Sequence, residues 1–304
     1  MSIGRFIVAC WLPVCFLIVM PVVACGQDSA AEVVRIWPGE TPTWKAPTEP
    51  ERDTSQPNSR TVAGRGVVRL GNVSNVELHL YPAKDADTTI VVCPGGGFSI
   101  LAWDLEGTEI AQWLQKQGIN AAVLKYRVPT RNEAVKWLPP VQDAQRAIAM
   151  IRAGAVKSMQ CQHVGILGFS AGGHAATRTT FAKQRHYDVA RKDEWVDGKP
   201  VSVKPDFAVL VYPAYLTTTR DGEALTDGLD VDENTPPIFF AHAYDDGLSC
   251  MGCVKLFSEL KRKGVRSSLH IFSTGGHGFG GRQSNQEKDA WLPLCKAWLS
   301  DNGF

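Results

Sequence analysis

The chain has 304 residues, of which 44% are hydrophobic, and it carries 32 lysines and arginines against 31 aspartates and glutamates. This near balance excludes the broad basic field with which proteins hold nucleic acid or an anionic membrane surface. We therefore expect no nucleic-acid partner and predict that binding specificity comes from a pocket. The length is sufficient for one large α/β domain.

The N-terminal segment has the pattern of an export signal. An apolar run over residues 6–23 follows Arg5, and small residues follow that run. The pattern predicts a signal peptide over residues 1–25 and an exported protein, secreted or periplasmic. A permanent transmembrane anchor is the alternative, because the run approaches membrane-spanning length. The residues that end at Cys25 also resemble a lipobox, and a lipid on Cys25 would be the one membrane attachment that we expect.

Residues 26–65 are rich in Pro, Glu, Thr and Ser and predict an extended arm, in which Trp37 and Trp44 favour contact with the domain. Residues 66–304 predict one catalytic domain, because strand and helix patterns alternate there. The expected strands are 73–81, 89–93, 121–124, one from 164, 207–212, 238–241 and 268–272, and the expected helices are 109–116, 141–152, 254–263 and 289–299. This order predicts an α/β fold with a mostly parallel central sheet and helices on both faces.

A G-x-S-x-G motif spans Gly168 to Gly172, between an apolar strand and a helix-compatible segment. Such a strand-to-turn-to-helix motif is typical of a nucleophile elbow, in which small residues are needed where the turn packs against its neighbours. It predicts Ser170 as a nucleophile and the N–H of Ala171 as one donor of an oxyanion hole. The alternative is a glycine-rich turn in an ordinary α/β protein.

A serine hydroxyl becomes a nucleophile when a base takes its proton and a third group orients that base. The strand 238–241 leads to Asp245 and Asp246, and the strand 268–272 leads to a glycine-rich loop that contains His277. We favour His277 as the base because it comes last in the chain and glycines flank it. Serine, aspartate, histidine is the chain order of the α/β-hydrolase triad.

The glycine run that follows the strand 89–93 is the second candidate for the oxyanion hole. Consecutive glycines let backbone N–H groups turn into a site, so Gly96 and Gly97 are predicted to act with Ala171. A phosphate-binding loop is the rival interpretation, but its lysine and its Ser/Thr are missing. We expect neither a metal nor a cofactor.

These motifs, together with Glu106-Gly107 and Tyr126-Arg127, resemble the α/β-hydrolase carboxylesterases of bacterial polysaccharide degraders. This BD-FAE-like family includes proteins named acetyl xylan esterase, feruloyl esterase and endo-1,4-β-xylanase B. The resemblance covers residues 73–299 and implies a single α/β-hydrolase domain. It also implies a triad of Ser170, Asp246 and His277, and it favours Asp246 over Asp245. The sequence departs from lipase-like members at Pro94, where they have the histidine of H-G-G-G.

The sequence thus predicts a secreted serine esterase that releases small acyl groups, acetyl first, from small-molecule or polysaccharide esters through an acyl-enzyme. One alternative is a peptidase of the prolyl-oligopeptidase type, although its large gating domain would not fit in this chain. Another is glycoside hydrolysis by a carboxylate pair such as Asp104 and Glu106. A third is a non-catalytic binding module that keeps the fold.

Overall fold

An eight-stranded sheet forms the centre of the molecule in the computed structural model, which describes Met1, Ala30 and residues 32–188, 191–219 and 224–304. Two strands at one edge of this sheet pair antiparallel, and the other six strands run parallel to one another. This confirms the predicted mostly parallel sheet. The spatial order is β1 (Glu32–Arg35), β4 (Glu77–Tyr81), β7 (Asn120–Lys125), β5 (Thr88–Cys93), β8 (His163–Phe169), β11 (Ala208–Val211), β12 (Ile238–Ala243) and β13 (Ser268–Phe272).

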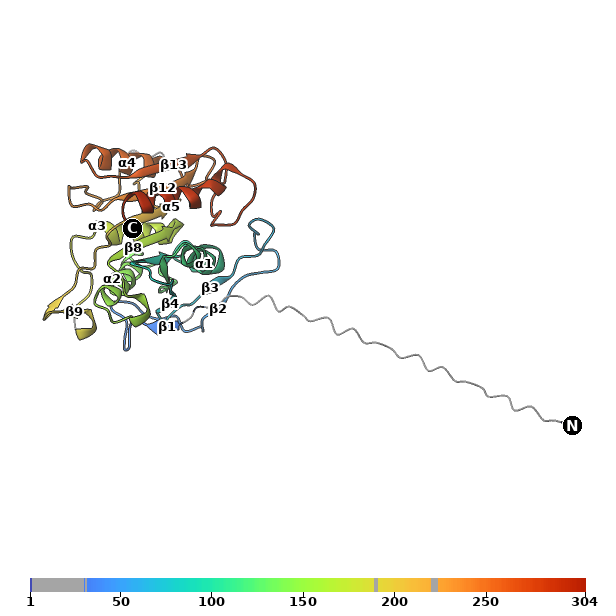
Figure 1. Cartoon of the computed structure of the whole chain (residues 1–304), viewed down its shortest axis with the longest axis horizontal. Helices are drawn as coiled ribbons and strands as arrows, with labels where there is room; N and C mark the ends of the chain where they lie inside the picture. Colours follow the sequence, from blue (N-terminus) through green and yellow to red (C-terminus); the bar gives the residue numbers. More distant parts are fainter. Residues whose placement is uncertain (2–29, 31, 189–190, 220–223) are drawn as a thin grey trace.

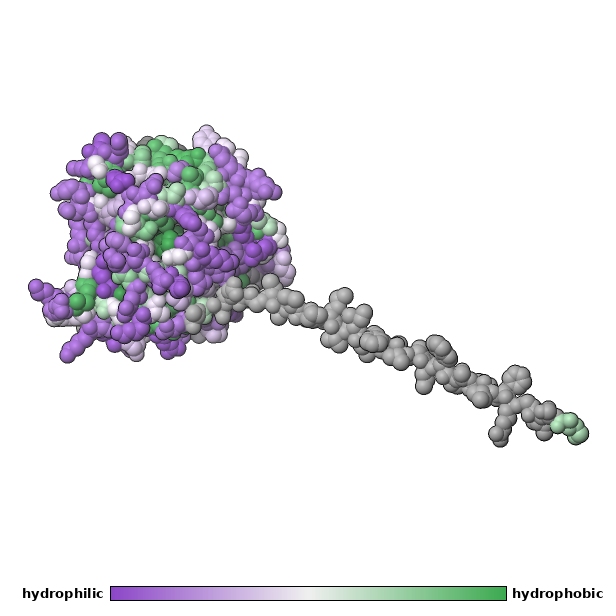
Figure 2. All heavy atoms as spheres, in the orientation of Figure 1, coloured by the Kyte–Doolittle hydropathy of each residue, from purple (hydrophilic) through white to green (hydrophobic). Residues whose placement is uncertain are grey.

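Helices cover both faces of the sheet, as predicted (Figure 1). The alternating side chains of β5 show the division, since Val91 packs into one hydrophobic cluster and Ile90 into the other. The first cluster lies under α2 (Leu138–Arg152), α3 (Ser170–Phe181) and α4 (Met251–Arg262), and the second under α1 (Glu109–Lys116) and α5 (Trp291–Asp301). Apolar side chains are thereby withdrawn from the surface, and the face shown in Figure 2 is mostly hydrophilic.

The expected arm contributes strands of its own. Strand β1 extends the central sheet, and β2 (Arg52–Asp53) forms a small antiparallel sheet with two strands of the predicted domain, β3 (Arg69–Gly71) and β6 (Ile100–Ala102). Both tryptophans of this segment contact the domain, because Trp37 donates to Asp143 at 2.6 Å and Trp44 donates to the Pro129 carbonyl at 3.4 Å. The segment is therefore packed on the domain from β1 onward.

Some elements begin at other residues than predicted. Helix α2 begins before its predicted start because prolines are tolerated in a first helical turn, where N–H groups lack partners. Strand β4 begins later than predicted, at Glu77.

The short elements are the π-helical turn η1 (Asp104–Thr108), the 3₁₀ turns η2 (Lys157–Met159), η3 (Lys192–Glu194) and η4 (Glu287–Ala290), and the hairpin strands β9 (Trp195–Val196) and β10 (Lys199–Pro200).

The predicted leader, apart from Met1, lies outside the described residues, and so does the predicted lipid site at Cys25. In the part of the chain that the structure describes, no helix is both long and apolar enough to cross a membrane.

Candidate active site

Ser170 lies at the junction of β8 and α3, at the carboxyl edge of the sheet. Its backbone has a φ of +50°, in the left-handed region that non-glycine residues rarely adopt. A Cβ on Gly168 would lie 2.4 Å from the carbonyl oxygen of Gly172. A Cβ on Gly172 would lie 2.2 Å from the carbonyl oxygen of Cys93. Only glycine fits at either position, as the motif predicts, and the turn projects Ser170 from the sheet edge.

The structure brings Ser170, His277 and Asp246 together in one hydrogen-bonded chain. The Ser170 hydroxyl lies 2.8 Å from Nε2 of His277, and Nδ1 of His277 lies 2.8 Å from Oδ2 of Asp246. The Asp246 side chain is fully buried, whereas that of His277 is 31% exposed, so the base is reachable from the cavity. The other oxygen of Asp246 accepts the Leu248 N–H at 2.7 Å. Asp245 is exposed and accepts the Gly276 N–H instead.

Two other histidines near the site are hydrogen-bonded to backbone carbonyls. His174 is buried on α3, where Nδ1 donates to the Ala214 carbonyl, and burial lowers its pKa to about 3. His242 is buried at the end of β12, donates to the Ala243 carbonyl, and burial lowers its pKa as well. Both imidazoles are therefore neutral near pH 7. Within the described ranges, no group of three or more His, Cys, Asp or Glu side chains could hold a metal ion.

The glycine loop after β5 lies against the nucleophile. A Cβ on Gly95 would lie 2.9 Å from the Cβ of Ser170. Gly96 and Gly97 both line the cavity at Ser170, with φ values of +134° and +64°. Within the described chain, no protein atom accepts the N–H of either glycine. Ala171 is buried in the first turn of α3, where backbone N–H groups lack helical acceptors. Gly96, Gly97 and Ser170 thus line one cavity, and Ala171 directly follows Ser170.

A buried carboxyl behind this loop was not predicted in the role that it has. Glu106, in η1, accepts the Gly95 N–H at 2.7 Å and the Tyr212 hydroxyl at 2.8 Å. The same hydroxyl accepts the Gly280 N–H at 2.9 Å, and the Tyr212 ring packs against His277. Burial raises the pKa of the Glu106 carboxyl. Glu106 and Tyr212 therefore tie the glycine loop to the histidine loop.

The cavity above Ser170 has a volume of about 580 Å³. Two carboxylates line it, Glu106 and Asp246, and both are already hydrogen-bonded inside the protein. Asp104, the other acid weighed for glycoside hydrolysis, lies outside the lining and is bound by the N–H groups of Val68 and Leu105 and by Arg282. The lining thus offers a serine and its base, and both of its carboxylates are engaged by donors inside the protein.

Comparison with known proteins places the chain among α/β hydrolases. Residues 77–214 match the model of the BD-FAE family. A curated relative, the acetylxylan esterase of Xylanibacter ruminicola, is 29% identical over 72% of this chain and 46% of its own length. The endo-1,4-beta-xylanase B of Butyrivibrio fibrisolvens is 28% identical over 68% of this chain and 35% of its own length. The chain thus spans less than half the length of these two relatives.

Solved structures share the fold over most of the chain. An acetyl ester-xyloside bifunctional hydrolase from Caldicellulosiruptor lactoaceticus is 26% identical, with a TM-score of 0.67, over 92% of this chain and 99% of its own. A butyrate-bound structure of the esterase Est2 from Thermogutta terrifontis has a TM-score of 0.62 at 24% identity. It covers 77% of this chain and 91% of its own, and this similarity shows the fold alone. These findings, together with the central sheet and the elbow, confirm the predicted α/β-hydrolase fold and the resemblance to the BD-FAE family over residues 77–214.

Proposed function

We propose that the chain is a serine carboxylic-ester hydrolase that removes acetyl or similarly small acyl groups from saccharide esters. The observation that carries this proposal is the hydrogen-bonded chain from Ser170 through His277 to Asp246. A serine, a base and a buried orienting acid in this geometry generate an alkoxide-like nucleophile at neutral pH.

The mechanism follows from these contacts. His277 takes the proton of Ser170 as the hydroxyl attacks the ester carbonyl, and Asp246 stabilises the resulting imidazolium. The N–H groups of Gly96, Gly97 and Ala171 receive the charge that develops on the carbonyl oxygen. His277 then gives its proton to the leaving alcohol, which leaves an acyl group on Ser170. Water, activated by the same imidazole, releases the acid and restores the serine.

The proposed substrate class rests on two supports. One curated relative is named an acetylxylan esterase, and a structural neighbour is named an acetyl ester-xyloside hydrolase. The cavity is open enough for part of a saccharide to reach Ser170. Together with the export-type leader, these supports favour esters of extracellular polysaccharide and a secreted or periplasmic place of work. Glycoside hydrolysis is disfavoured because both lining carboxylates are already engaged by internal donors.

The test compares Ser170→Ala with the parent protein on p-nitrophenyl acetate and on acetylated xylo-oligosaccharide. We expect kcat to fall by about a thousandfold or more, because the nucleophile is removed. Ser158→Ala is the matched control, since that hydroxyl donates to Glu32 far from the site, and it should keep full activity. Ester hydrolysis that survives in Ser170→Ala would overturn the proposal, and release of xylose by this variant would favour a glycosidase instead.

A further inference from the structure

Three arginines line the cavity around Ser170: Arg60, Arg69 and Arg131. In the described part of the chain none of them forms an ion pair with a carboxylate. The hydrogen bonds of their guanidinium groups go to backbone carbonyls. Acids act on two of these arginines at longer range, Asp53 on Arg69 and Glu106 on Arg60. The whole chain has a formal net charge of +1, whereas the cavity lining holds three arginines and two acids, Glu106 and Asp246, that are hydrogen-bonded inside the protein.

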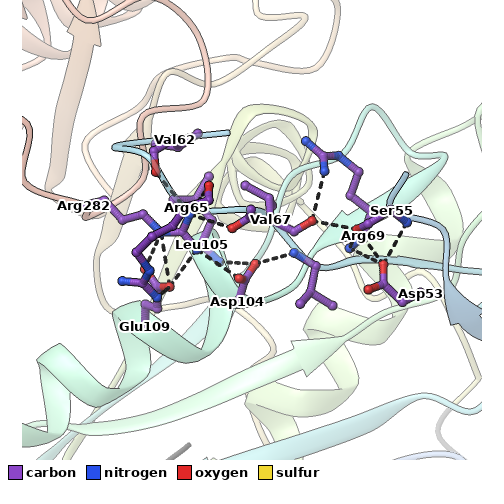
Figure 3. Close-up of polar contacts among 12 residues, drawn as sticks. Asp53, Ser55, Val62, Arg65, Val67, Arg69, Asp104, Leu105, Glu109 and Arg282 are labelled. Carbon is purple, nitrogen blue, oxygen red and sulfur yellow. Dashed lines mark hydrogen bonds and ion pairs between the residues drawn. The ribbon is translucent and has the colours of Figure 1, made fainter. Parts of the chain in front are cut away.

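The segment that supplies Arg60 and Arg69 is held firmly against the domain (Figure 3). Arg282 donates to the carbonyls of Val62, Arg65 and Gly66, and it is ion-paired with Asp104 and Glu109. The Val68 N–H donates to the same Asp104. Anchored at several points, this segment keeps its arginines beside the cavity in a fixed arrangement.

Arg60 and Arg69 lie on the side of the cavity where the histidine acts. Nη1 of Arg60 donates to the His277 carbonyl at 2.7 Å, and Nη2 of Arg69 donates to the Arg60 carbonyl at 3.1 Å. In the proposed mechanism His277 protonates the leaving oxygen, so the alcohol part of the ester must lie on this side. These two arginines therefore border the saccharide and not the acyl group.

Arg131 approaches from the oxyanion side, with Nη1 3.4 Å from the Gly97 carbonyl. Beyond it, the ammonium group of Lys136 lies 3.6 Å from the centre of the Tyr215 ring, which also lines the cavity. Partial burial and the charge of Arg131 lower the pKa of Lys136, which indicates that positive charges crowd one another here. The cavity mouth thus has cations on both sides of the nucleophile.

We propose that this site selects esters whose alcohol part carries an anionic group, a carboxylate or a sulfate on an acidic saccharide. The inference deepens the proposed esterase function and rests on it. Guanidinium groups bind such anions through paired, charge-assisted hydrogen bonds, and arginines that form no ion pair at a cleft also steer anions toward it. A neutral xylan chain would offer these guanidinium groups no charged partner.

The test measures kcat/KM on three acetylated oligosaccharides: a neutral xylo-oligosaccharide, an oligogalacturonide and a sulfated galacto-oligosaccharide. We expect at least one acidic substrate to exceed the neutral one by about tenfold, as a charge-assisted contact allows. The preference should shrink between low and high salt, because exposed charges are screened. The preferred acidic substrate identifies which anion the arginines receive.

Variants then assign the preference to the arginines. Arg60→Gln and Arg131→Gln should each lower the acidic-to-neutral ratio of kcat/KM by roughly three- to tenfold. Arg65→Gln is the matched control, because Arg65 lies on the same segment but is paired with Glu109 and does not line the cavity. Its ratio should match that of the parent protein.

Two results separate this inference from the esterase proposal. Equal kcat/KM on neutral and acidic esters, with p-nitrophenyl acetate hydrolysis intact, would overturn the anionic substrate and leave the esterase standing. If no ester is hydrolysed, calorimetric titration of the full protein with unacetylated oligogalacturonide and sulfated galacto-oligosaccharide decides. Salt-sensitive binding of either, weakened in Arg60→Gln, supports the anion site, and no binding of either overturns it.

Discussion

Replacing Asp246 by asparagine tests the orientation of the proposed catalytic base. One oxygen of Asp246 accepts the Leu248 N–H at 2.7 Å, and the other faces Nδ1 of His277 at 2.8 Å. In Asp246→Asn the amide oxygen stays with the Leu248 N–H, because the amide NH₂ group cannot accept a hydrogen bond. The amide NH₂ group then faces Nδ1 of His277 and donates to it. The imidazole proton is thereby held on Nε2, which can no longer accept the proton of Ser170.

The expected cost follows from this wrong tautomer. In a serine triad of this geometry the loss of the orienting carboxylate lowers kcat about 10⁴-fold, which corresponds to about 5 kcal/mol in the activation barrier. The assay is steady-state hydrolysis of p-nitrophenyl acetate at pH 7 to 8, with circular dichroism to establish that the variant is folded. The thermal midpoint should change little, because asparagine fills the same volume.

Asp245→Asn is the matched control on the neighbouring residue. Asp245 is exposed, and its contact with the Gly276 N–H at 2.7 Å can be made equally well by an amide oxygen. We expect kcat within roughly threefold of the parent value, as for most surface substitutions. The reasoning would be refuted if Asp245→Asn were the damaging change, or if Asp246→Asn kept more than a tenth of the activity.

Three further predictions concern the support of the site. Gly172→Ala should destabilise the fold by about 3 kcal/mol or more and lower Tm by roughly 6 °C, since its Cβ would meet a backbone oxygen. Gly66→Ala is the control and should leave Tm unchanged, because the space around Gly66 is open. Equal melting curves for the two variants would contradict this prediction. Tyr212→Phe leaves the buried Gly280 N–H without an acceptor and removes a donor from Glu106, so we expect a loss of about 3 kcal/mol in urea unfolding together with reduced kcat. Burial raises the pKa of Glu106 above 4.5, so the stabilisation by this carboxyl is full below that pH and is lost as pH rises through the folded-state pKa. Glu106→Gln should remove this pH dependence of the unfolding free energy. Parallel pH profiles for the variant and the parent protein would exclude the effect.

The sequence predicted the parts of the site that local chemistry determines. Gly168 and Gly172 bracket a turn that only small residues can make, so the motif alone located Ser170. The apolar strands that precede Asp246 and His277 are strong local signals, and parallel strands end at one edge of a sheet. The chain order of these residues therefore predicted that they meet, and in the structure they do.

The parts that were missed depend on contacts between distant segments. Strands β1, β2 and β3 are only four, two and three residues long, too short for an alternating pattern to stand out. Glu106 and Tyr212 are 106 positions apart, and no spacing rule links a buried carboxyl in a turn to a tyrosine after another strand. Arg60 likewise lies in a polar segment that composition marks only as an arm, 217 positions before the carbonyl to which it donates.

The central claim is that Ser170 is the nucleophile of an esterase, and covalent labelling tests it most directly. The protein is treated with a serine-directed phosphonate, residual p-nitrophenyl acetate hydrolysis is followed, and the adduct is located by peptide mass spectrometry. We expect one phosphonyl group on Ser170 and a loss of activity in proportion to labelling. Full activity after treatment, or inactivation with the label on another residue, would contradict it.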